Sequence, residues 1–138
     1  MKSKKFKVLT YEPLELKEKV TKYSPDFTKL RIEYSPEIQN GWAGDWDSRT
    51  NTIKIHKGLS DVDRDGVLIH EFVEMMVTTM MGIPGYPHPD YNQEIHGELN
   101  QMAHDFANSV ERKILEMSGV SWEEHERRVN EVRNKKIE

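Results

Sequence analysis

Residues 68–76 read LIHEFVEMM and lie in the middle of a stretch with helical periodicity. Ser60 or Asp61 is suited to cap its start, and Gly82 followed by Pro84 is a strong stop signal. Between these signals, apolar residues recur at intervals of three and four: Ile69, Phe72, Val73, Met76 and Met80. The sequence therefore predicts one long helix, whose apolar line and methionines are expected to pack into a core.

The same helix carries a polar group of defined geometry. His70 and Glu74 are four residues apart, so both project from one face of the helix. An imidazole nitrogen and a carboxylate oxygen both suit Zn²⁺, and this spacing lets them bind one ion. Glu71 points about 100° away from His70, which lets it reach a metal-bound water rather than the metal. Glu71 is therefore placed as a general base.

A second helix is predicted over residues 90–118, with Asp90 as its N-cap and an apolar side of its own. That apolar side consists of Ile95, Leu99, Met102, Phe106, Val110 and Ile114. Beside it runs a polar row, in which His104 and Glu111 are seven residues apart and His96 and Asn100 lie close by. This row is expected to face the edge of the core and the preceding helix.

Catalytic zinc takes three protein ligands as a rule, so the polar row is where the third ligand is expected. His104 is the preferred candidate. Glu111 is either a fourth ligand or the acceptor for the free N–H of a ligating histidine, and His96 is the other candidate for completing the sphere. His88 and Asp90 are further donors, but they lie in the proline-rich loop 82–90, which makes their placement unpredictable.

The rest of the chain predicts an α+β fold with a small, mostly antiparallel sheet. Alternating residues indicate strands at 4–10 and 29–35, and a hairpin joins 42–46 to 51–56, with Ile53 and Ile55 facing the core. Shorter helices are expected at 13–23 and, capped by Ser121, at 121–136. No linker or repeat is visible, so we expect a single domain over 1–138 with its core at about 29–118.

A hairpin that ends in NTIKIHKG, followed by a helix bearing HEFVE, resembles the core of the zincin metallopeptidases. The resemblance covers roughly residues 29–111 and rests on the order of elements and on an H-E-x-x-H-type helix. It implies that His70 is the first metal ligand, that Glu71 is the general base, and that Glu74 stands at the second-ligand position. It also implies that the edge strand formed by Trp42, Ala43, Gly44, Asp45 and Trp46 binds an extended peptide or protein substrate by strand addition.

The sequence departs from the zincin pattern at Glu74, where the family has a second histidine. A carboxylate still binds zinc, but its negative charge makes the ion a weaker Lewis acid and raises the pKa of a bound water. A site with more oxygen ligands also accepts Mn²⁺ or Fe²⁺. The resemblance thus implies a zinc peptidase fold more strongly than it implies peptidase activity.

The composition excludes several classes of site. The 138-residue chain has no cysteine, so a metal must be held by His, Asp and Glu, and disulfides are excluded. With a net charge of −4 and no long apolar run, neither nucleic acid nor membrane is an expected partner, and a cytoplasmic location is the default. Residues 41–110 hold four Lys/Arg against eleven Asp/Glu together with five of the six histidines, which is where a cation site is expected.

Rival interpretations stay open at this point. The domain could be a non-catalytic interaction module in which the metal is structural or absent, and the oligomeric state is not readable. A dinuclear carboxylate site is disfavoured, because Glu-x-x-His pairs on two helices are missing. Trp42 and Trp46 are expected to cover one side of the sheet, although exposed indoles could also hold a ligand. His56 and His125 are expected to be ordinary surface histidines.

Overall fold

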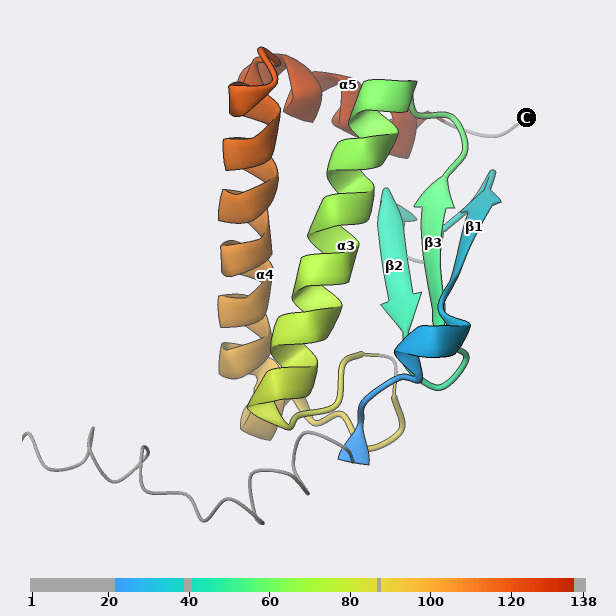
Figure 1. Ribbon diagram of the computed structural model, residues 1–138, viewed down its shortest axis with the longest axis vertical. Coiled ribbons are helices and arrows are strands. Elements are labelled where there is room, and N and C mark those ends of the chain that lie inside the picture. The colour runs from blue at the N-terminus through green and yellow to red at the C-terminus, as the bar shows by residue number, and fades with distance from the viewer. Residues whose placement is uncertain (1–21, 39–40, 87, 136–138) are drawn as a thin grey trace, which may run out of the picture.

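The computed structural model describes residues 22–38, 41–86 and 88–135, which form an α+β fold (Figure 1). Its elements are the 3-10 turn η2 (Phe27–Lys29), the strands β1 (Arg31–Ser35), β2 (Gly44–Asp47) and β3 (Thr52–His56), and the helices α3 (Asp61–Met81), α4 (Gln93–Met117) and α5 (Trp122–Asn134). The strand expected at 4–10 and most of the helix expected at 13–23 lie outside the described residues.

The three strands form one mixed sheet in the order β1-β3-β2. The predicted hairpin is confirmed: β2 and β3 are antiparallel, with Trp46 opposite Ile53, and Asn51 in the turn has φ 55, a conformation that asparagine tolerates well. The expectation of a mostly antiparallel sheet is wrong. Because β1 pairs with β3 rather than with its neighbour in sequence β2, it runs parallel to β3, with Ile32 opposite Ile53.

The apolar core lies between the sheet and α3. Ile53 and Ile55 are completely buried, as predicted, and they pack with Trp46, Val67 and Met75. Figure 1 shows α3 between the sheet on one side and α4 on the other. The sheet and α3 therefore bury each other's apolar side chains, and α4 packs against the side of α3 that faces away from the sheet.

The helix boundaries follow their capping residues closely. Ser60 caps α3 by accepting a hydrogen bond from Asp63 N–H, and Gly82 ends it in the left-handed conformation with φ 73. For α4 the predicted cap was wrong: Asn92 rather than Asp90 accepts from the first backbone N–H groups of the helix. Ser121 caps α5, as predicted. The helices α3 and α4 run antiparallel, and α5 crosses the end of the pair (Figure 1).

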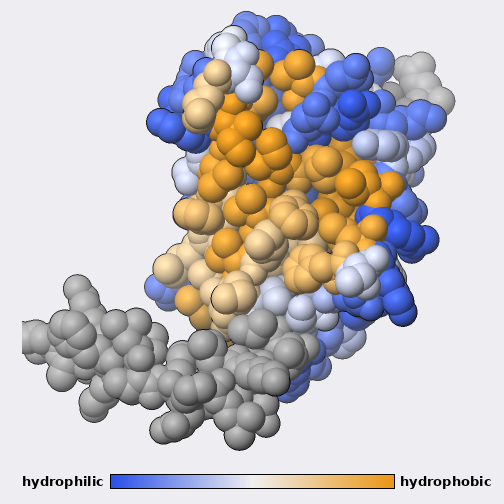
Figure 2. All heavy atoms as spheres, in the orientation of Figure 1, coloured by the Kyte–Doolittle hydropathy of each residue, from blue (hydrophilic) through white to orange (hydrophobic). Residues whose placement is uncertain are grey.

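The apolar line of α3 does not face the core as expected, and the apolar side of α4 is exposed as well. Met76 and Met80 on α3, and Met102 and Phe106 on α4, are exposed. Helix α3 turns a different side to the sheet, the one that carries Val67 and Met75. As a result, Figure 2 shows apolar side chains spread over the face where α3 and α4 lie in Figure 1. None of the helices in the described ranges has the length and apolar content needed to cross a membrane.

Candidate metal centre

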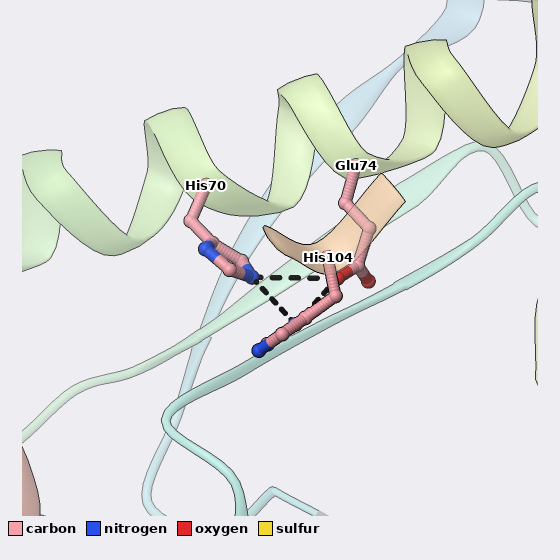
Figure 3. Close-up of side chains that lie close together, drawn as sticks. All are labelled: His70, Glu74 and His104. Carbon is pink, nitrogen blue, oxygen red and sulfur yellow. Dashed lines mark hydrogen bonds and ion pairs between the residues drawn. The ribbon is translucent and has the colours of Figure 1, made fainter. Parts of the chain in front are cut away.

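Three donor atoms from two helices meet at one point (Figure 3). His70 and Glu74 project from α3, and His104 reaches them from α4. His70 Nε2 lies 3.2 Å from His104 Nδ1 and 3.4 Å from Glu74 Oε2, and His104 Nδ1 lies 2.8 Å from Glu74 Oε2. His70, Glu74 and His104 therefore form a candidate metal-binding triad.

The spacing of the triad fits a tetrahedral ion. Zinc bonds of ~2.0–2.1 Å at tetrahedral angles place neighbouring donor atoms about 3.3 Å apart. The three separations, 2.8 to 3.4 Å, lie close to that value. Two imidazole nitrogens and one carboxylate oxygen are also a donor set that zinc uses, so the residues present fit the ion in both spacing and chemistry.

Each ligand candidate has its second polar atom held by another side chain. Trp46 Nε1–H donates to Glu74 Oε1 over 2.9 Å, which leaves Oε2 for the triad. His70 Nδ1 lies 3.1 Å from Glu111 Oε1, which leaves Nε2 for the triad. His104 Nε2 lies 3.4 Å from the side-chain nitrogen of Asn108, which leaves Nδ1. Such contacts orient metal ligands before an ion arrives.

Behind His70, a buried chain of polar groups continues into the protein. The second oxygen of Glu111 lies 2.5 Å from His125 Nε2, and His125 Nδ1 lies 2.9 Å from Asp63 Oδ1. Arg128 closes the chain by donating from Nε and Nη2 to the two carboxylate oxygens of Asp63. The expectation that His125 is an ordinary surface histidine is therefore wrong, since it is 2% exposed and bonded at both ring nitrogens.

Gly66 makes room for this chain. A Cβ at Gly66 would lie 3.0 Å from both His125 Cε1 and Leu115 Cδ1. A larger residue at this position would therefore crowd the His125 ring and the Leu115 side chain. The inward orientation of His125 was missed because it depends on this contact between α3 and α5, more than fifty residues apart in sequence.

The triad concentrates opposite charges. Burial opposes the charged form of His70, but hydrogen bonds with Glu111 and Glu74 outweigh it and raise the pKa of His70 to about 10. Burial likewise opposes ionisation of Glu74, yet the hydrogen bonds from His104 and His70 lower the pKa of Glu74 to about 2. The carboxylates of Glu74 and Glu111 therefore favour positive charge beside them, on His70.

Glu71 lies against the edge strand rather than in the triad. A Cβ at Gly44 of β2 would come within 2.9 Å of Glu71 Cγ, so a glycine is needed where the strand meets this side chain. Burial raises the pKa of Glu71 well above its usual range, and the neighbouring carboxylates of Glu74 and Asp45 add to the effect, against the attraction of His70. Glu71 is thus buried next to the triad as a carboxyl group with an increased tendency to hold a proton.

A cleft of about 500 Å³ connects these groups. Its lining includes His70, Glu71, Glu74 and His104, the edge-strand residues Trp42 to Trp46, and side chains from α5 such as Arg133. Among the described strands, β2 pairs only with β3, and its residues line one wall of the cleft. His56 N–H donates to Ala43 O. In an antiparallel pair, successive residues of a strand point their backbone N–H and C=O alternately toward and away from the partner strand. Because Ala43 points toward β3, the backbone N–H and C=O of Gly44 point away from it.

The other sequence candidates lie apart from the triad. Asn92 N–H donates to His96 Nδ1 at the start of α4, so His96 serves the helix end. Asp90 N–H donates to His88 Nδ1 within the loop. Glu111 is different, because its Oε1 lies 3.1 Å from Nδ1 of His70, the histidine predicted to be the first ligand. Trp46, Asp63 and His125 were missed as supporting residues, and nothing in their sequence spacing points to the site.

Neither the sequence nor the structure matches a known protein: no family model, no curated protein and no solved structure showed significant similarity.

Proposed function

We propose that this protein is a metal-dependent peptide hydrolase with a zincin-like centre. The observation that carries the proposal is the convergence of His70 Nε2, Glu74 Oε2 and His104 Nδ1, each fixed by a partner at its other polar atom. Zn²⁺ is the preferred ion, and Mn²⁺ or Fe²⁺ are chemically acceptable to two histidines and one carboxylate.

The number of protein donors favours a catalytic role over a structural one. A structural zinc site is closed by a fourth protein ligand, whereas a catalytic site keeps one position for water or substrate. The two candidates for a fourth ligand are both engaged elsewhere, Glu111 with His70 and His125, and His96 with the backbone of Asn92. His104 is also nearly half exposed in the cleft, which gives solvent and substrate access to the triad.

In the proposed reaction, Glu71 accepts a proton from water as the water attacks a peptide carbonyl, and passes that proton to the leaving amine. The raised pKa of Glu71 makes its carboxylate a stronger proton acceptor than an exposed glutamate. Zinc, when bound, would polarise the carbonyl and lower the pKa of water. Glu74 in place of a histidine weakens that polarisation, so we expect a slower hydrolase than a two-histidine helix provides.

The substrate would lie along β2 in the cleft. An extended peptide that pairs with the outer edge of Gly44 places its carbonyl groups beside Glu71 and the triad. Trp42 forms an edge-to-face contact with Tyr86 in the same cleft, which offers an aromatic surface to one substrate side chain.

Metal content measured by inductively coupled plasma mass spectrometry tests the site. We expect near-stoichiometric metal in the untagged wild-type protein and its loss in His70→Ala and His104→Ala. His96→Ala is the matched control, since it removes a histidine of the same helix pair that lies outside the triad. A wild-type protein without metal, even after incubation with zinc, would contradict the proposal.

Activity is tested separately with Glu71→Gln. A peptide-library digest should show cleavage by the wild type and a loss of ~10²–10⁴-fold in Glu71→Gln, at unchanged metal content. Metal binding without any cleavage would leave a metal-stabilised interaction domain as the function. Equal cleavage by the two proteins would show that Glu71 is not the base.

A further inference from the structure

The outer side of the α3–α4 pair carries exposed apolar residues on both helices. On α3 these are Phe72, Met76 and Met80. On α4 they are Ile95, Leu99, Met102, Phe106, Ile114 and Met117. We call these nine residues the outer face. Figure 2 shows apolar surface continuing across the region of both helices.

The outer face is too large to be ordinary surface. Its side chains are on average about half exposed, with Ile95 at 69% and Phe106 at 53%. Taking roughly 200 Å² for each large side chain, they present on the order of 900 Å² to solvent. The largest apolar patch of a typical monomer is ~300–600 Å², whereas each partner of a stable complex buries ~800 Å². The outer face therefore has the size of an interface.

We propose that the outer face joins two copies of this chain. Two antiparallel helix pairs placed face to face form a four-helix arrangement, and each apolar line then meets another apolar line. A symmetric interface of this kind needs no complementary charge, and the outer face is nearly free of charge. Lys113 is the one charged residue that we place on the α4 line; it lies toward the C-terminal end of α4, where its apolar stem can pack while its ammonium reaches water.

The charges beside the outer face favour a protein partner over a lipid surface. Exposed Glu98, Asp105 and Glu116 follow one flank of the α4 line at intervals of seven and eleven residues. Acidic side chains at this position would be repelled by the anionic headgroups of a membrane. Between two copies, they would stay at the solvated rim.

The interface leaves the cleft open. His104 and Asn108 line the cleft from α4, whereas Met102 and Phe106 lie on the opposite side of that helix. Association of two copies therefore does not require the metal site, and the two proposals can fail independently.

Light scattering coupled to size-exclusion chromatography, on the full chain over a range of concentrations, tests the interface. We expect the wild type at twice the mass of the chain. Met102→Glu/Phe106→Glu should run at the mass of one chain, with a dissociation constant raised by ~100-fold or more. The control Thr50→Glu adds charge on the hairpin turn and should remain a dimer. Circular dichroism checks that each variant folds, and metal content should be unchanged in all of them.

Several outcomes would overturn the inference. A wild type that stays at the mass of one chain at every concentration would exclude the dimer. If that monomer also binds phosphatidylserine-containing vesicles, lipid covers the face; if the two glutamates lower its melting temperature strongly, residues 1–21 of the same chain are the better candidate. A dimer that persists in Met102→Glu/Phe106→Glu would place the contact on another surface.

Discussion

The two sides of α4 both depart from the usual pattern of a surface helix, because the inner side buries Glu111 beside Ala107 and Leu115 and the outer side exposes large apolar residues. The side that faces α3 and the cleft carries His104 and Glu111, and Glu111 is almost completely buried. The opposite side carries Met102 and Phe106, which are more than half exposed. Glu111 is thus kept inside because it bonds His70 and His125, whereas Met102 and Phe106 leave about half of their side chains uncovered. The first side carries the proposed metal site, and the second carries the proposed association surface.

The largest effect should come from Glu111→Ala on the inner side. The change leaves the ring nitrogens of His70 and His125 without their shared acceptor in a buried position, which costs about 3–5 kcal/mol of unfolding free energy. Urea denaturation measures it. Glu116→Ala on the same helix is the control; its exposed pair with Arg112 should contribute less than ~0.5 kcal/mol. Similar losses for both variants would remove the distinction between the two sides.

Asp63→Asn tests the far end of the buried chain through pH. Burial opposes ionisation of Asp63, but hydrogen bonds from Arg128, His125 and Ser60 lower its pKa from 3.8 to about 2. A lowered pKa stabilises the folded state above about pH 4, and this contribution of about 2 kcal/mol is lost as the pH falls from about 4 toward 2. The wild type should lose stability in that interval, and Asp63→Asn should be less stable at pH 7 and less pH-dependent below 4. Parallel curves for the two proteins would contradict this role.

Trp46→Phe tests how the sheet supports the triad. The variant keeps a smaller aromatic ring in the core and removes the N–H that holds Glu74 Oε1. We expect zinc affinity to fall ~10–100-fold, as measured by competition with a chromogenic chelator. Trp42→Phe is the control, because Trp42 lines the cleft without a hydrogen bond to the triad among the described contacts. Equal losses in both variants would point to the aromatic residues as packing rather than positioning groups.

The smallest effect should come from His96→Ala. His96 is a histidine of α4, but its ring nitrogen bonds the backbone of Asn92. We expect unchanged zinc stoichiometry and a change in unfolding free energy within ~0.5 kcal/mol. Loss of zinc in this variant would mean that the site reorganises around the ion and that residues at the start of α4 help to bind it.

The sequence was sufficient for the local parts of this molecule. Ser60, Gly82 and Ser121 mark helix ends through their own backbone chemistry, and the alternation around Ile53 and Ile55 identifies a half-buried strand. The His70–Glu74 pair is also local, since one turn of helix fixes its geometry. His104 could be selected because so few histidines lie at the right position on a second helix.

What could not be predicted depends on how elements pack. Apolar periodicity shows that a helix has an apolar side, but it does not say whether the same chain covers that side, so Met76 and Met80 were wrongly expected inside. The direction of β1 depends on which strand it joins. The roles of Trp46 and His125 depend on contacts 28 and 14 residues away in sequence, with Glu74 and Glu111.

The layered arrangement also has a consequence for dynamics. Helix α3 is held on one side by the sheet, whereas α4 is fastened chiefly to α3 and α5 (Figure 1). An ion shared between α3 and His104 would link α4 to α3. Its release would let α4 separate locally before the sheet unfolds. Amide hydrogen exchange along α4 would then follow metal occupancy, while exchange in β3 would follow global unfolding alone.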